Sequence, residues 1–129
     1  MDAKSRQRLT DQELAIMNIV WERGQATVRD VYEVMLRERK IAYTTVMTTM
    51  KIMQQKGHLK KRSEGRAYVY SPTQPKSQVI RNLVTDFVGR VFQGSAEPLL
   101  LHLVQNQDLS AQDLEKARRA AQAAREEDR

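Results

Sequence analysis

The sequence contains no cysteine, and its 129 residues include only 5 glycines and 5% aromatic residues. The absence of cysteine excludes disulfides, thiolate zinc sites and cysteine nucleophiles. The scattered glycines form no phosphate-binding loop, and neither a nucleophile elbow nor an HExxH motif occurs. The 2 histidines, His58 and His102, have no paired carboxylate at ligand spacing. We therefore expect no enzyme, no metal site and no cofactor.

Long hydrophobic runs are also missing. The chain has no stretch of about 18 consecutive apolar residues, and its polar beginning lacks the apolar segment of a signal peptide. We therefore expect no membrane insertion and a cytoplasmic location. A hydrophobic content of 40% with 29% charged residues lies in the ordinary globular range, which argues against extensive disorder.

Positive charge is abundant and unevenly distributed. The net charge is +6, yet the first 76 residues hold 15 Lys and Arg against 8 Asp and Glu, while the remainder holds 7 against 8. A basic first part followed by a nearly neutral second part indicates that the first part meets a polyanion such as DNA. The second part then has a different task.

Three helices are predicted in the basic part. Residues 10–13 (TDQE) and 27–30 (TVRD) both have the form of capping boxes, which begin helices. Apolar residues follow each box at helical spacing, as far as Gly24 in the first helix and the charged run 37–40 in the second. The third helix comes next and ends at Gly57, a residue suited to a helix C-terminus.

The third helix has two different faces. Its apolar face, which suits a core, consists of Val46, Met50 and Met53 with Met47 beside them. The opposite face has no carboxylate and consists of Thr44, Thr48, Lys51 and Gln55. Hydroxyls, an amide and an ammonium suit contact with base edges and phosphates. The alternative is an ordinary surface helix with solvated threonines, but 4 threonines in 6 residues are costly for a helix unless they are used.

A β-hairpin is predicted after the third helix. Two β-prone runs, residues 59–62 and 67–70, flank a turn that contains glycine. Three helices followed by a hairpin are typical of a winged helix-turn-helix. The hairpin carries the cations Lys60, Lys61, Arg62 and Arg66, where a wing would contact DNA phosphates. A solvated charge run is the alternative interpretation of this cluster.

The fold class predicted is mainly α, with a winged-helix DNA-binding domain in residues 1–75 and a helical dimerisation domain in residues 76–129. In the second domain, apolar side chains form wide helical stripes at Val79, Ile80, Leu83, Val84, Phe87, Val88, Val91, Phe92, Leu100 and Leu103. Because a small number of helices cannot cover these apolar stripes, we expect the stripes to be buried against a second copy of the chain. A core helix within one subunit is the alternative.

Four motifs in order resemble the penicillinase-repressor (BlaI/MecI) family: residues 9–14 (LTDQEL), 26–31 (ATVRDV), 43–50 (YTTVMTTM) and 64–70 (EGRAYVY). Residues 109–114 are similar to that family's final helix. The resemblance implies a dimeric winged-helix repressor on an inverted-repeat operator, often of a β-lactamase operon. It also implies release through a membrane-bound sensor protease that detects β-lactams.

The resemblance further implies that Thr44, Thr45, Thr48 and Lys51 read DNA and that Arg66 is a wing contact. Two positions depart from the family pattern. Many members carry an arginine where this chain has Ile52, so a phosphate or guanine contact would be either absent or replaced by apolar contact with a thymine methyl. The Asn-Phe pair cut in the best-known members aligns with His102-Leu103.

A different class of function remains open, namely a module whose winged helix binds a protein while the basic hairpin is incidental. Salt distinguishes the two, because binding through several phosphates weakens steeply as salt rises.

Overall fold

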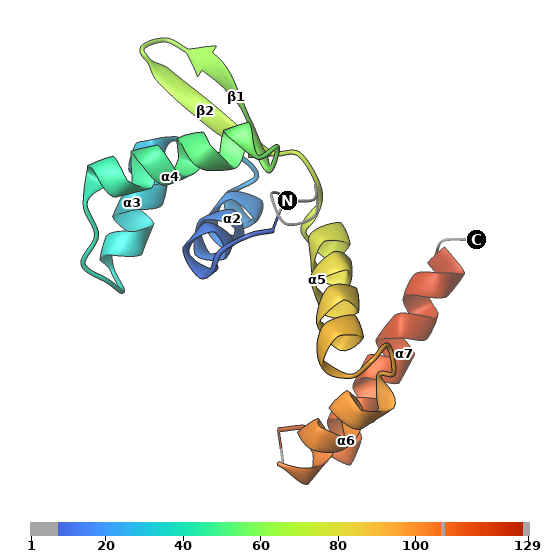
Figure 1. The fold of residues 1–129 in the computed structure, drawn as a ribbon. Helices are drawn as coiled ribbons and strands as arrows, with labels where there is room; N and C mark the ends of the chain where they lie inside the picture. Colours follow the sequence, from blue (N-terminus) through green and yellow to red (C-terminus); the bar gives the residue numbers. More distant parts are fainter. Residues whose placement is uncertain (1–7, 107, 128–129) are drawn as a thin grey trace. The chain divides into compact units, whose positions relative to one another are not determined.

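The computed structural model describes residues 8–106 and 108–127 and is mainly helical (Figure 1). The first helices and the hairpin are α2 (Asp11–Arg23), α3 (Val28–Leu36), α4 (Tyr43–Gln55), β1 (Leu59–Glu64) and β2 (Ala67–Pro72). They are followed by α5 (Lys76–Val91), α6 (Glu97–Gln105) and α7 (Ala111–Glu127). The predicted fold class, a three-helix and hairpin arrangement followed by further helices, is confirmed.

The chain forms two compact units, one ending at Ile80 and the other beginning at Arg81. This division falls inside α5, so the helix starts in the first unit and continues in the second. The predicted domain boundary between residues 75 and 76 stays a prediction.

Both predicted capping boxes at the start of α2 and α3 are present. The Thr10 hydroxyl accepts a bond from the Glu13 amide at 3.1 Å, and the Thr10 amide donates to the Glu13 carboxylate at 2.8 Å. Thr27 and Asp30 exchange the same two bonds at 3.1 and 3.0 Å. These reciprocal bonds satisfy amides that have no partner inside the helix, so the sequence signature fixes where each helix begins.

The core of the first unit lies between α2, α3, α4 and the base of the hairpin. Its buried side chains are Ile16, Met17, Val20, Ala26, Val31, Met35, Val46, Met50, Met53, Leu59 and Tyr70. The predicted core face of α4 is confirmed for Val46, Met50 and Met53 but wrong for Met47, which is 45% exposed. Met47 lies about 60° around the helix from Met50, beyond the arc that α2 and α3 cover.

An ion pair connects the start of α2 with the end of α4. The Lys56 ammonium lies 2.9 and 3.0 Å from the two carboxylate oxygens of Glu13, which is only 3% exposed. Burial by itself raises the pKa of the Glu13 carboxyl, but the bonds from the Thr10 backbone and from Lys56 outweigh it, so the pKa is lowered. The charged form is therefore the one that the fold stabilises.

The hairpin is an antiparallel pair in which Arg62 lies opposite Val69 and Lys61 opposite Tyr70. β2 also bonds to the segment between α2 and α3, because Ala26 and Tyr70 exchange backbone hydrogen bonds of 2.9 and 2.8 Å. This single bridge acts as a minimal third strand, which the sequence pattern did not predict. It holds the connection between α2 and α3 against the hairpin.

Two hydrogen bonds fix the segment that leaves the hairpin. The Trp21 indole donates to the Gln74 carbonyl at 3.0 Å, and the Thr73 hydroxyl donates to the Gly57 carbonyl at 2.7 Å. Gly57 itself has φ 90°, a left-handed conformation that favours glycine and ends α4. The hairpin is therefore attached at its base to both α2 and the end of α4.

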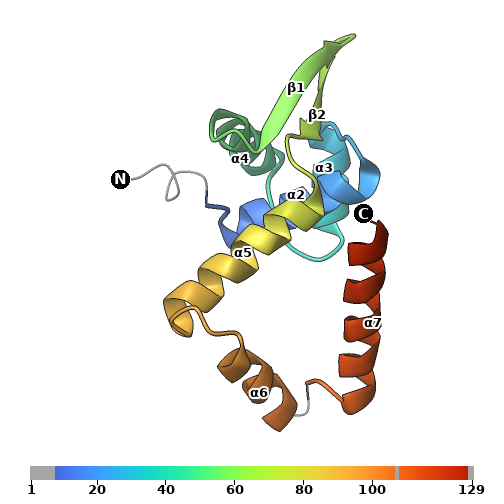
Figure 2. The same ribbon diagram turned by 90° about the vertical axis from the view of Figure 1, so that its right-hand side faces the viewer.

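In the second unit, α5 ends at Val91, and Gln93 and Gly94 just beyond it have φ values of 51° and 88°. The predicted cap at the start of α7 is confirmed, since the Ser110 hydroxyl accepts from the Asp113 amide at 3.1 Å and the Ser110 amide donates to the Asp113 carboxylate at 3.0 Å. Among the residues that the structure describes, α5, α6 and α7 pack only weakly against one another (Figure 2).

Replacing Lys56 with methionine should destabilise the first unit. At neutral pH we expect a loss of about 2 kcal/mol in the free energy of unfolding, because the variant leaves the buried Glu13 carboxylate without its cation. Urea unfolding followed by fluorescence of Trp21, the single tryptophan, measures this quantity.

The loss should shrink in acid. Because the folded pKa of Glu13 lies below its ordinary value of 4.5, the stabilisation is complete above 4.5 and disappears as the pH falls through the folded pKa. Glu33→Gln is the control, because Glu33 pairs with Arg29 at the surface and its loss should change stability by less than about 0.5 kcal/mol. Equal losses for Lys56→Met and Glu33→Gln would contradict the prediction.

Candidate nucleic-acid interface

All five α4 residues predicted to contact DNA point away from the core. Thr44, Thr45, Thr48, Lys51 and Gln55 are exposed, whereas the buried side chains of the helix lie on its other side. The sequence of α4 contains no acidic residue. The helix therefore presents a carboxylate-free stripe of hydroxyl, ammonium and amide groups, which suits a polyanion and the edges of bases.

The first turn of α4 is fixed by aromatic contacts to α3. The rings of Tyr32 and Tyr43 meet edge to face with centroids 5.4 Å apart, and the Arg29 guanidinium lies 5.8 Å from the Tyr43 ring centroid. At the cap position, Ala42 makes no side-chain hydrogen bond to the helix. Unlike α2 and α3, this helix therefore begins without a carboxylate at its N-terminus, which keeps the positive end of its dipole available to an anion.

One of the four α4 threonines has an internal role. The Thr49 hydroxyl donates to the Thr45 carbonyl at 2.7 Å and accepts from the Gln12 amide at 3.4 Å. It therefore helps to join α4 to α2, while Thr44, Thr45 and Thr48 remain exposed. Thr49 was not among the residues predicted to contact DNA, and its contact with Gln12 depends on how the two helices pack.

The hairpin cations differ in their surroundings. Lys60, Arg62 and Arg66 are all exposed, as predicted for a wing. Arg62, however, bonds to the Glu64 carboxylate at 2.6 Å and to the Gln25 amide oxygen at 2.9 Å. Lys61 lies on the opposite face of the hairpin, with its ammonium 4.3 Å from the ring centroid of Tyr68. The charge of Arg62 is thus partly neutralised within the protein, and its bond to Gln25 depends on packing between segments far apart in the chain.

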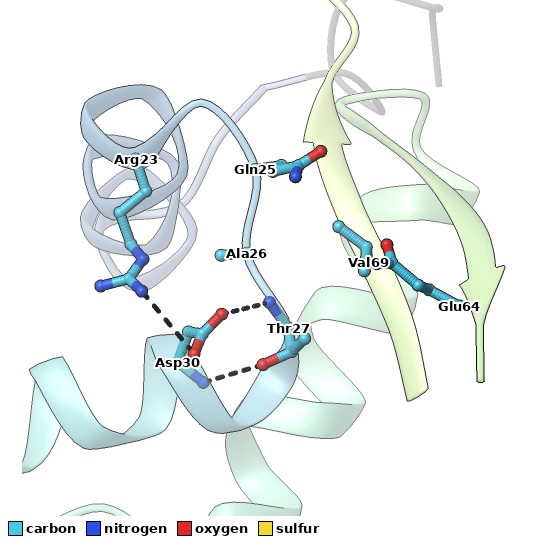
Figure 3. A pocket seen from close by; sticks show the side chains of 7 residues that line it. All are labelled: Arg23, Gln25, Ala26, Thr27, Asp30, Glu64 and Val69. Carbon is cyan, nitrogen blue, oxygen red and sulfur yellow. Dashed lines mark hydrogen bonds and ion pairs between the residues drawn. The ribbon is translucent and has the colours of Figure 1, made fainter. Parts of the chain in front are cut away.

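A shallow pocket lies between the hairpin and the start of α3 (Figure 3). Glu64 and Val69 approach it from the hairpin, and Arg23 and Asp30 from the helices. Its polar groups bond to one another: Arg23 lies 3.7 Å from Asp30, whose carboxylate also accepts from the Thr27 amide. That backbone bond is the main cause of the lowered pKa of Asp30. These bonds therefore link the end of α2 to the start of α3.

The predicted dimerisation residues are largely uncovered. Along α5, Ile80, Val84, Phe87 and Val91 are 41 to 50% exposed and lie three or four residues apart, which places them in one stripe. Val79, Leu83, Phe92 and Leu103 are partly buried, Leu100 is 44% exposed, and Val88 is 8% exposed. Phe87 and Phe92 meet edge to face at 5.9 Å, so part of this apolar surface already packs within the chain.

Across residues 8–106 and 108–127, no helix is long and apolar enough to cross a membrane. In the same residues, no three His, Asp or Glu side chains gather in a way that could hold a metal ion.

Known proteins resemble this chain over most of its length. The sequence pattern of the family described as "Penicillinase repressor" matches residues 9–123. "Transcriptional regulator BlaI" of Mycobacterium tuberculosis is 32% identical over 115 residues, which cover 88% of this chain and 82% of that protein. "Penicillinase repressor" of Bacillus licheniformis is 24% identical over 107 residues, or 83% of this chain and 84% of that protein.

Solved structures resemble the first unit. The solution structure of the DNA binding domain of the repressor BlaI superposes with a TM-score of 0.51 at 25% sequence identity, covering 55% of this chain and 87% of that domain. The family pattern spans both units, and the structural likeness agrees with the three helices and hairpin described above. This chain belongs to the penicillinase-repressor family.

Proposed function

We propose that the protein is a sequence-specific DNA-binding transcriptional repressor that acts as a homodimer on an inverted-repeat operator. The observation that carries this proposal is the exposed, carboxylate-free stripe of α4, directly opposite the core face of the same helix. Membership of a family whose named members are repressors supports it. A β-lactamase operon is the regulated target that the family implies.

In this proposal α4 enters the major groove. Lys51 and Gln55 offer donors suited to guanine and adenine edges, and the hydroxyls of Thr44, Thr45 and Thr48 can bond to bases or phosphates. The hairpin supplies Lys60, Arg62 and Arg66 to the phosphate backbone. Arg62 would have to exchange its bonds to Glu64 and Gln25 for a phosphate, so we expect Lys60 and Arg66 to contribute more.

Dimerisation follows from the apolar stripes of α5 and α6. Weak packing among the three C-terminal helices leaves these stripes exposed in a single chain, and large exposed apolar patches are uncommon on monomers. A second copy of the chain would bury them through a two-fold interface. Two α4 helices related in this way would read half-sites about 34–36 Å apart, or a multiple of that spacing.

Release of the operator would involve the C-terminal helices. The family resemblance implies a membrane-bound sensor protease as a partner, and the aligned residues His102 and Leu103 lie inside α6. His102 is exposed, and its carbonyl accepts a hydrogen bond from the Asn106 amide at 3.1 Å, so this segment is regular helix. Cleavage there would require local unwinding of α6, since proteases bind extended segments.

A footprint across the DNA upstream of the protein's own gene tests the proposal. We expect protection of a palindrome in the presence of competitor DNA and a steep loss of affinity as salt rises. Failure to find any site bound better than competitor would overturn the proposed function. Binding of a protein partner that is indifferent to salt would favour an interaction module instead.

Thr48→Ala and Lys51→Ala should each weaken operator binding about tenfold. Both side chains are exposed, so we expect unchanged thermal unfolding. Lys116→Ala is the matched control for Lys51→Ala, because it removes an exposed positive charge from α7 instead of α4. Gel shifts measure the affinities. A large drop in melting temperature would place Thr48 or Lys51 in the core and contradict the assignment of the two faces.

Phe87→Arg should convert the dimer into monomers and weaken operator binding. The substitution puts a charge into the middle of the α5 stripe, where it would have to be buried against the partner copy. Thr85→Arg is the control, since it introduces the same side chain at an exposed position of α5 outside the stripe. Sedimentation measures the oligomeric state. If the Phe87→Arg variant stays dimeric, the dimer interface lies elsewhere in the chain.

A further inference from the structure

Ile52 is an exposed apolar side chain on the outward side of α4. It is 41% exposed and follows Thr48 by one helical turn, so it borders the polar stripe. Met47, 45% exposed, borders the stripe on its other side. The surface that α4 offers to a partner is therefore polar along its middle and apolar at both edges.

On the side of Ile52 that faces away from the polar stripe, the polar side chains within one helical turn are engaged within the protein. Lys56, one turn further on, directs its ammonium to Glu13. Thr49, in the preceding turn, has its hydroxyl bonded to the Thr45 carbonyl and to the Gln12 amide. The neighbouring donors that stay exposed, Thr48, Lys51 and Gln55, lie on the stripe side of Ile52. Ile52 itself offers a partner only methyl and methylene groups.

The charge of the surrounding surface favours DNA as the partner. α4 has no carboxylate, and the first 76 residues carry the whole positive excess of the chain. In the major groove of DNA, the apolar group that a base pair displays is the C5-methyl of thymine, which cytosine lacks. An isoleucine at the border of a groove-reading stripe therefore has one chemically matched target.

We propose that Ile52 contacts a thymine methyl in each operator half-site and so determines specificity for thymine at that position. The inference rests on the proposed function, in which α4 enters the major groove. It adds one readout to that function: a base position recognised by apolar contact, next to the positions that Thr48 and Lys51 recognise through hydrogen bonds.

Exchange of thymine for uracil removes this methyl group and leaves the hydrogen-bonding edges unchanged. Each thymine of the footprinted operator is replaced by deoxyuridine, in both half-sites together, and the affinity of the full chain is measured. At one symmetric pair of positions we expect wild-type affinity to fall about fourfold for each methyl removed, which corresponds to ~0.8 kcal/mol. Ile52→Ala should bind the unmodified operator more weakly and should no longer respond to uracil at that pair.

The Ile52→Ala substitution and the thymine-to-uracil exchange together form a double-mutant cycle, and two further variants serve as controls for it. Ile52→Val keeps branched methyl groups and should retain part of the response to uracil at the same pair. Met47→Ala shortens the exposed apolar side chain at the other border of the stripe and should leave that response at its wild-type size. Thermal unfolding of Ile52→Ala should be unchanged, because the side chain is exposed and alanine favours helix.

The outcomes separate this inference from the function on which it rests. If the affinity of the wild-type chain stays the same when each thymine is replaced by uracil, the contact is overturned. The contact is also overturned if the affinity of Ile52→Ala falls as much as that of the wild type. In both cases the repressor function stands, because the operator is still bound specifically. The absence of any specifically bound DNA overturns both. Salt-independent protein binding that Ile52→Ala abolishes would overturn the contact in favour of a protein partner.

Discussion

The buried ion pair between Glu13 and Lys56 is the constraint on which the first unit depends. Glu13 belongs to the capping box that begins α2, and Lys56 follows the last residue of α4. One carboxylate therefore fixes both the start of one helix and the position of the end of another. A buried charge is costly unless it is fully bonded, so this pair permits few alternative arrangements of α2 and α4.

The same packing sorts the polar side chains of α4 into two groups. Thr49 and Lys56 bond to Gln12 and Glu13 of α2, whereas Thr48 and Lys51 stay exposed. The internal bonds hold the helix in place, and the exposed side chains form the surface that can meet DNA. A rigid helix loses little conformational freedom on binding, which favours precise reading of a groove over adaptable contact.

The exposed stripe of α5 is apolar, in contrast to the polar exposed face of α4. In α5 the stripe from Ile80 to Val91 stays about half exposed, although Phe87 and Phe92 meet within the chain. The described parts of α5, α6 and α7 pack only weakly against one another, so none of these helices covers the stripe. The proposed homodimer resolves this imbalance, and it connects apolar burial in one unit to paired DNA reading by the other.

The sequence by itself determined the helices, the hairpin and the core face of α4, because capping boxes and apolar periodicity are local signals. It also placed Thr44, Thr48, Lys51 and Gln55 on an exposed face. Only the tertiary structure decided that Met47 lies outside the core, that Ala26 pairs with Tyr70 and that Arg62 bonds to Gln25. Those outcomes depend on contacts between residues far apart in the chain, which local periodicity does not encode.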